Sequence, residues 1–318
     1  MNKASKRLYS SILSSFPISG KTVLWLLKII IPISLTVSLL QYWGIIAIVA
    51  GLLAPVFSLI GLPGESAIVF ITSIFVPLYA PIAIIATLPL EIREITILAL
   101  MCLISHNLFV ETAIQKKTGS SAFIMFTLRI SASFIGAFLL NLLLPEHIGT
   151  ANAAKEIVVF QNIQEMLLDW ITNTAWLSLK IALIITGLMM LQNVLKEFNV
   201  LSLLSKSFAP LMRMMGLSKE SSFLWFVAQI IGLTYGSAIM LEELKQNEIT
   251  LADANLLNYH IAINHSLLED TLLFVAIGVP AGWIIAPRFI MSIIVVWAMR
   301  GLFKLSKNTQ NSKYHVEH

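Results

Sequence analysis

The chain has 318 residues, of which 57% are hydrophobic and only 12% are charged, and its mean hydropathy is +0.85. A soluble domain carries about 25% charged residues, and a soluble fold of this length has too little interior to bury so much apolar surface. These values exclude an ordinary soluble protein and predict an all-α integral membrane protein. The net charge of +4 does not indicate a nucleic-acid partner, because the basic residues gather at the two ends of the chain.

Basic residues flank the apolar part of the chain on both sides. Those before the first apolar run are Lys3, Lys6, Arg7 and Lys21, and those after the last are Lys304, Lys307 and Lys313. Positive charge in such positions marks cytoplasmic ends. We therefore expect a multi-pass protein of the cell membrane (plasma or inner), with residues 1–22 and 304–318 cytoplasmic and the polar tail 308–318 disordered. Cys102 lies in an apolar run, which leaves no disulfide framework and no CxxC metal site.

Apolar segments fall in two sets of five along the chain. They cover roughly 23–41, 44–60, 66–90, 95–112 and 122–144, and then 171–192, 199–215, 221–241, 254–276 and 283–303. Three prolines predict a kinked or re-entrant segment over 66–90, and Lys206 and Arg213 suggest a surface-lying amphipathic helix over 199–215. The chain therefore has eight to ten transmembrane helices. Helical spacing of apolar residues over 157–169 predicts an interfacial helix between the two sets.

The two sets resemble each other and predict an internal repeat. Gly-Leu-Pro-Gly-Glu-Ser at 61–66 corresponds to Gly-Leu-Ser-Lys-Glu-Ser at 216–221, at a separation of 155 residues. Further on, the separation is 159, and it joins His106 to His265, Gly119 to Gly278 and Arg129 to Arg288. We expect a short insertion around 253–258 to account for the difference. Five crossings in each copy would invert the second copy relative to the first, and Lys116 and Lys117 favour that odd number.

The predicted organisation follows from this repeat. Residues 23–145 form the first copy, 146–173 a linker with its interfacial helix, and 174–303 the second copy. Self-association into a homo-oligomer is left open by the sequence.

Polar residues inside apolar helices carry the chemistry of this chain, because a charge at the bilayer centre costs about 2.5–3.5 kcal/mol. The first group is His106, Asn107, Glu111 and Thr112, in a helix that is otherwise apolar from Ile95, and the second is His265, Glu269, Asp270 and Thr271. His265 and Glu269 are four residues apart and share a helix face, whereas the spacing of His106 and Glu111 makes them diverge. Imidazole and carboxylate together suit a divalent transition metal or a proton relay. We propose His106, Glu111, His265 and Glu269 as metal ligands, and these four with Asn107 and Asp270 as the path of a solute or ion. The alternative is a structural role, in which these groups only bond neighbouring helices.

Two further pairs of charged residues recur in both copies. Glu65 and Glu220 each follow a Gly-Leu turn and open an apolar helix. They either stabilise the helix dipole or line the solute path, as helix starts do in transporters with broken helices. Arg129 and Arg288 either pair with carboxylates or extend to the headgroups, and a role in contacting the substrate is the alternative.

The resemblance that these features carry is to the Gate domain. Two tandem copies, each with a Gly-Leu-x-x-Glu-Ser turn entering a helix and then a polar His/Asn helix, resemble the membrane modules of concentrative nucleoside transporters, ferrous iron transporter B proteins and spore maturation membrane proteins. The resemblance implies a transport or permeation role, with polar residues of the two copies meeting near the midplane. The GTPase domain and membrane cysteines of the iron transporters are missing, so the substrate does not carry over.

We therefore predict a secondary permease and not an enzyme, with no cofactor, because the chain holds no nucleotide-binding loop, nucleophile elbow or HExxH. Its cargo is a small solute, with a divalent cation such as ferrous iron ahead of a nucleoside, since amides and aromatics that would grip a base are sparse. A non-transporting membrane scaffold is the alternative from another class.

Overall fold

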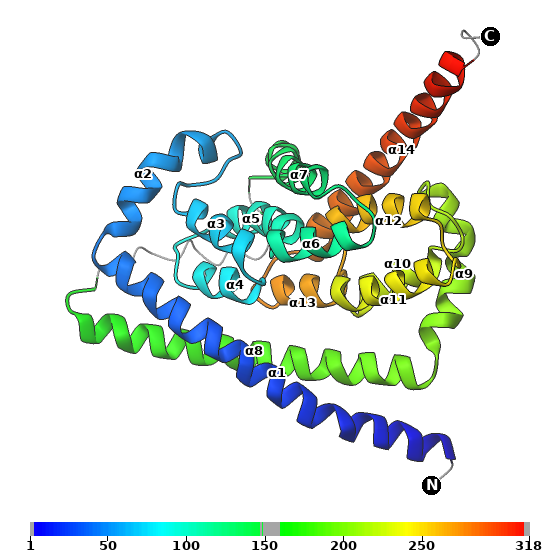
Figure 1. Ribbon diagram of the computed structural model, residues 1–318. Helices are drawn as coiled ribbons and strands as arrows, with labels where there is room; N and C mark the ends of the chain where they lie inside the picture. The colour runs from blue at the N-terminus through cyan, green and yellow to red at the C-terminus, as the bar shows by residue number, and fades with distance from the viewer. Residues whose placement is uncertain (1–2, 147, 149–159, 315–318) are drawn as a thin grey trace.

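The computed structural model describes residues 3–146, 148 and 160–314, and every element in this part of the chain is a helix (Figure 1). The first half contains α1 (Lys3–Tyr42), α2 (Ile45–Ser58), α3 (Ser66–Phe75), α4 (Tyr79–Ile85), α5 (Ile92–Ser105), α6 (Leu108–Lys117) and α7 (Ala122–Leu143). The second half contains α8 (Ile163–Glu197), α9 (Val200–Met214), α10 (Ser222–Ile230), α11 (Leu233–Lys245), α12 (Leu251–Ile263), α13 (Glu269–Val275) and α14 (Ala281–Tyr314). The predicted all-α membrane fold is confirmed.

Several helices are long and apolar enough to cross a membrane. Among the described residues there are five: Ala4–Tyr42, Ile92–Lys117, Ala122–Leu143, Ile163–Glu197 and Ala281–Lys304. The second of these joins α5 and α6 across a break. The other predicted segments are shorter helices, because prolines and turns interrupt them: 66–90, for example, is split into α3 and α4 around Pro77. The number of crossings, eight to ten, therefore stays a prediction.

The two longest helices of the lower layer in Figure 1, α1 and α8, lie side by side and antiparallel. Arg7 Nε, near the start of α1, lies 2.7 Å from Glu197 Oε1 at the end of α8. At the other end, Trp170 Nε1 donates to Ser34 Oγ at 3.1 Å. If α1 and α8 open corresponding units, the second unit is inverted relative to the first.

Positions that the repeat pairs have matching backbone conformations. The positive φ angles are 73° and 52° at Gly44 and Asn199, 73° and 76° at Gly61 and Gly216, 48° and 47° at Asn107 and Ser266, and 101° and 100° at Gly119 and Gly278. Positive φ is uncommon outside glycine, so its recurrence at spacings of 155 and 159 supports the predicted repeat. Superposition of residues 23–145 on 174–303 remains the direct test of that prediction.

The boundaries of several predicted segments differ from the structure. Residues 3–22 are not a separate segment but the first half of α1. The predicted interfacial helix over 157–169 lies partly outside the described residues, and 163–169 form the first turns of α8, so the 173/174 boundary falls inside a continuous helix. The helix α14 continues to Tyr314, where a disordered tail was expected.

The predicted insertion at 253–258 is also wrong. The N-cap residues Glu91 of α5 and Thr250 of α12 are already 159 residues apart. The extra residues therefore precede Thr250, in the longer helix α11, which has 13 residues where α4 has 7.

The core of the molecule is formed by two antiparallel helices, each interrupted once: α5 continues after a break as α6, and α12 continues after a break as α13. Every residue of α5 from Ile95 to Ser105 is buried, and α12 is buried from Leu256 to Ile263. The end of α6 lies by the start of α12, since a Cβ at Gly119 would meet the Leu251 side chain. The turn after α13 lies by the start of α5, where a Cβ at Gly278 would lie 3.1 Å from Ile92 Cδ1. This arrangement places the two breaks against each other in the middle of the molecule.

Candidate functional site

Each of the two central helices is interrupted at its histidine. Helix α5 ends at Ser105, His106 is extended with ψ 152°, and Asn107 has a left-handed conformation before α6 begins. The freed Asn107 N–H donates to Ser73 O at 2.7 Å, and the corresponding Ser266 N–H donates to Ala228 O at 3.0 Å. The prediction of an unbroken polar helix is therefore wrong, and His265 and Glu269 do not share a helix face.

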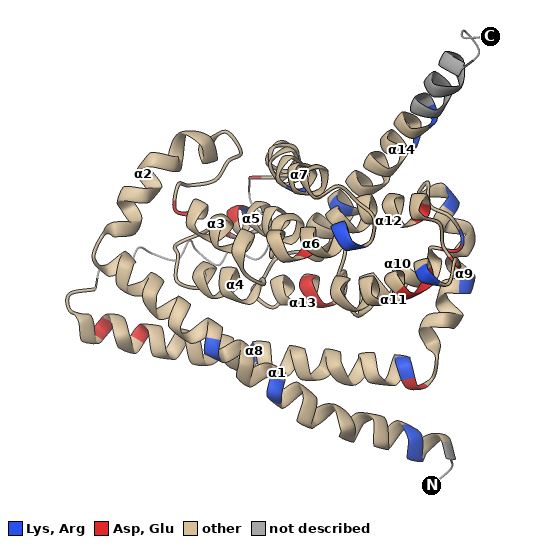
Figure 2. Ribbon diagram, viewed as in Figure 1, with Lys and Arg blue, Asp and Glu red and all other residues tan. Residues whose placement is uncertain are grey.

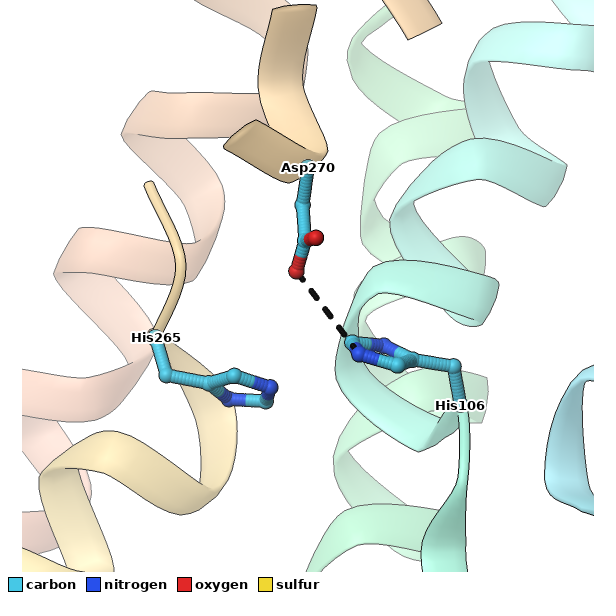
Figure 3. A group of neighbouring side chains, drawn as sticks. All are labelled: His106, His265 and Asp270. Carbon is cyan, nitrogen blue, oxygen red and sulfur yellow. Dashed lines mark ion pairs between the residues drawn. The ribbon is translucent and has the colours of Figure 1, made fainter. Parts of the chain in front are cut away.

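The two imidazoles face each other across the breaks, as Figure 3 shows, with ring centroids 5.1 Å apart. His106 Nδ1 lies 3.1 Å from Cys102 O, and His265 Nδ1 lies 2.7 Å from Ile261 O. A carbonyl can only accept a hydrogen bond, so each Nδ1 carries the proton. Each Nε2 is then left with its lone pair for a carboxylic acid proton or a metal ion, or it is protonated beside a carboxylate.

Two carboxylates from opposite halves of the chain meet these Nε2 atoms. Glu111 of α6 lies 3.3 Å from His106 Nε2 through Oε1 and 3.3 Å from His265 Nε2 through Oε2. Asp270 of α13 lies 3.7 Å from His106 Nε2 through Oδ2 (Figure 3). Both acids are at least nine-tenths buried. The polar groups therefore do bond neighbouring helices, as the structural alternative expects. They do so in a single cluster, however, in which side chains from both halves of the chain converge.

The two fully buried arginines of the repeat differ in their partners. Arg129 Nη2 lies 2.7 Å from Glu111 Oε2 and donates to His106 O at 2.8 Å. Arg288 Nη2 donates to His265 O at the same distance, 2.8 Å, and to Asn264 Oδ1 at 3.0 Å. No ion pair joins Arg288 to an acid in the described structure, although Asp270 occupies the position that corresponds to Glu111. One half therefore has its carboxylate neutralised, and the other leaves Asp270 directed at His106.

The group best placed to hold a metal ion is His106, His265 and Asp270, whose ligand atoms all lie within 4.8 Å of one another. Asp270 belonged to the predicted path but not to the predicted ligand set. Of the expected ligands, Glu111 is engaged by Arg129, and Glu269 accepts a hydrogen bond from Tyr79 Oη at 2.5 Å. Glu269 therefore lies one residue from the cluster but points to α4.

The remaining predicted residues lie elsewhere. Asn107 contributes its backbone to the break, and its side chain forms no capping hydrogen bond with the described residues of α6. Glu65 is the N-cap residue of α3 and lies close enough to Glu94 for an electrostatic interaction. Glu220 is exposed at the turn before α10. The structure does not bring Glu65 or Glu220 to the histidine cluster.

Two residues that belong to the candidate site were not identified in the sequence analysis. Tyr79 recurs as Tyr235 at a separation of 156, but only Tyr79 contacts a site residue, while Tyr235 lies under Lys196 Nζ at 4.5 Å. Asn264 precedes His265 as Ser105 precedes His106, and its amide oxygen holds Arg288. An asparagine just before a buried histidine was the available signal.

Comparison with known proteins agrees with this architecture. Residues 23–141 match the sequence profile of the Gate family, which is described as nucleoside recognition. The chain is 28% identical over 292 residues to YvoD of Bacillus subtilis (strain 168), described as an uncharacterized membrane protein, and this covers 90% of the chain and 93% of the relative. No solved structure matches the chain. Over residues 23–141 the chain is thus similar to the Gate family, and over most of its length it is similar to a membrane protein.

Proposed function

We propose that this protein is a secondary permease whose cargo is a divalent transition-metal cation, bound where the two broken helices meet. One observation carries the proposal: His106, His265 and Asp270 bring two imidazole nitrogens and one carboxylate oxygen within 4.8 Å of one another. Nitrogen with oxygen ligands suits transition metals, whereas Mg²⁺ and Ca²⁺ prefer oxygen alone. The Nδ1 protons bonded to carbonyls support the same role, since ligating histidines are oriented in this way.

The chain's membrane character and its Gate domain support transport as the activity. A binding site made at helix breaks from both halves of the chain is typical of transporters in which a fixed midplane site opens to either side. The absence of a nucleotide-binding loop from the sequence points to a gradient as the energy source.

Arg129 is paired with an acid and Arg288 is not, and this difference supports a transport cycle in which the two arginines pair with their acids alternately. In the state described here, Arg129 neutralises Glu111 while Asp270 faces the cargo position. In the opposite-facing state, Arg288 pairs with Asp270 and Arg129 releases Glu111 to the cargo. Replacing Arg288 by Gln should then slow transport more than it weakens cation binding.

Uptake into proteoliposomes tests the proposed activity. Wild-type protein should accumulate Fe²⁺ or Mn²⁺ with saturable kinetics, and Mg²⁺ should not compete. His106→Ala, His265→Ala and Asp270→Asn should each abolish uptake. His260→Gln is the matched control, because His260 is equally buried but bonds Trp225 and Ser292 outside the cluster. Wild-type vesicles without any uptake would favour the scaffold instead.

A nucleoside is the second candidate cargo, and a specific observation favours it. Several buried polar atoms of residues in or next to the helix breaks and of the two arginines have no hydrogen-bond partner among the described residues: Thr112 Oγ1, Thr271 Oγ1, Gln229 Oε1, Arg129 Nη1 and Arg288 Nη1. Buried groups of this kind are costly unless a ligand bonds them, and the hydroxyls and carbonyls of a nucleoside could do so. Uridine uptake that metal ions leave unchanged would decide for this cargo.

A further inference from the structure

A hollow of about 1170 Å³ lies at one end of the molecule, away from the histidine cluster. It is formed where the turn between α9 and α10, the start of α12 and the last part of the α14 span come together, with Gly119 after α6 at its edge. Figure 2 shows basic residues gathered over this end, on α9, on α14 and at the end of α6.

The hollow carries unneutralised positive charge. Its lining includes four cations and two acids: Arg213, Lys219, Arg300 and Lys304, with Glu220 and Asp253. None of these cations forms an ion pair with a described residue. Asp253 is already engaged by the Thr250 hydroxyl at 2.5 Å, and Arg300 donates through Nη1 to Gly216 O at 3.0 Å. The site therefore favours an anion.

One wall of the same hollow is apolar. It consists of Leu217, Leu251, Leu256, Trp297 and Phe303. Trp297 is 48% exposed, yet its ring is held in place because Nε1 donates to Met214 O at 2.9 Å. An exposed tryptophan and cations at the end of an apolar segment are typical of headgroup depth in a bilayer, and in the sequence of α14 the apolar run up to Phe303 is followed by Lys304 and Lys307. A ligand that fits the hollow has an anionic group for the cations and an apolar part for this wall.

The first half of the chain lacks these cations. At the positions that correspond to Arg213, Lys219, Arg300 and Lys304, separated by 155 or 159 residues, it has Ser58, Gly64, Asn141 and Pro145. The two acids are kept, as Glu65 and Glu94. The fold therefore does not require these four cations; the first half has one cation at a corresponding position, Arg93 in place of Ala252, and it donates to Asn141.

We propose that this hollow binds the phosphate-bearing headgroup of an anionic phospholipid, with an acyl chain along Trp297 and Phe303. Basic pockets between membrane helices bind such headgroups. General positive charge on a cytoplasmic face would also place lysines here, but it would need neither a shaped hollow nor an oriented tryptophan. The proposal is independent of the cargo.

The test is lipid binding by the purified full-length protein, measured by native mass spectrometry in detergent with phosphatidylglycerol, with phosphatidylcholine and with inorganic phosphate. Wild type should retain one phosphatidylglycerol in preference to phosphatidylcholine, and phosphate should not displace it. Lys219→Ser combined with Lys304→Ser should weaken that binding about thirtyfold. The matched control, Lys206→Ser combined with Lys245→Ser, removes the same charge from exposed positions outside the hollow and should change it less than threefold.

Three results would overturn the proposal. Equal retention of the two lipids would show no anion site, and displacement by phosphate would show a site for the free anion. Equal losses in the two double variants would show that overall charge, and not the hollow, attracts the lipid. The comparison of lipids in the wild type stands even if a variant fails to fold.

Discussion

At the scale of single residues, His106 and His265 define the site. Each sits just past the end of a helix, where the carbonyl four residues earlier accepts its Nδ1 proton. The imidazoles are therefore oriented by local backbone, and no other side chain is needed to direct Nε2 toward the opposite half. This explains why two histidines far apart in the sequence can form one binding group.

Protonation of these imidazoles should oppose cation binding. A metal ion requires a neutral Nε2 and an ionised Asp270, so protons compete with it. Uptake of Fe²⁺ or Mn²⁺ should therefore fall as the medium is made more acidic. Uptake measured between pH 5 and 8 at constant membrane potential checks this, and a rate that rises in acid would instead indicate a proton-coupled organic cargo.

The two buried arginines should differ in their effect on stability. Arg129→Gln leaves Glu111 as a buried carboxylate without its cation, and breaking a buried pair in this way costs about 3–5 kcal/mol. Arg288→Gln breaks no ion pair with any described residue, and it removes two buried nitrogens, Nε and Nη1, that have no hydrogen-bond partner in the same part of the chain. Thermal unfolding in detergent should show a much lower midpoint for Arg129→Gln. Similar midpoints for the two variants would contradict the asymmetry of the site.

At the scale of elements, the helix breaks decide which acids reach the histidines. Sequence reasoning could locate both polar groups, because charged residues stand out in apolar segments. It could not choose Asp270 over Glu269, since that choice depends on the left-handed conformation of Ser266, and serine has no particular preference for it. In the same way, the apolar pattern over 95–112 continues through Asn107 and conceals the break.

The left-handed conformation of Ser266 predicts that the same substitution, Ser to Gly, changes the stability in opposite directions at two positions. Because φ is 47° there, Ser266→Gly should relieve strain and stabilise the protein by about 1 kcal/mol. Ser237→Gly, in the middle of α11, should destabilise it by about 0.5 kcal/mol. Both are measured as changes in the unfolding midpoint. Destabilisation by Ser266→Gly as large as that at Ser237 would show that Ser266 is helical.

At the scale of the whole molecule, charge separates the two ends. Figure 2 shows acidic residues near the start of α8 and mostly basic residues around α9, while α1 begins and α14 ends toward the basic side (Figure 1). Positive charge favours the cytoplasm, which supports the expected orientation. The sequence predicts this from residue positions alone. The repeat is supported by the matching positive φ angles of the two halves, and its inversion by the antiparallel arrangement of α1 and α8.

Cysteine labelling should reveal this orientation. With the buried Cys102 replaced by Ala, Lys206→Cys should react with an impermeant maleimide only from the cytoplasmic side. Glu165→Cys, at the opposite end of α8 from Glu197, should react only from outside in intact cells. Labelling of both positions from the same side would rule out both the orientation and the spanning of α8.

We propose that the two broken helices meet in one cation site, and Co²⁺ binding to the purified protein tests this site without depending on transport. Visible absorption should report one Co²⁺ per chain, with the spectrum expected for imidazole ligands. His106→Ala and His265→Ala should each remove the signal, and His260→Gln should keep it. Binding that persists unchanged in both site variants, or the absence of any binding by the folded wild type, would contradict the account.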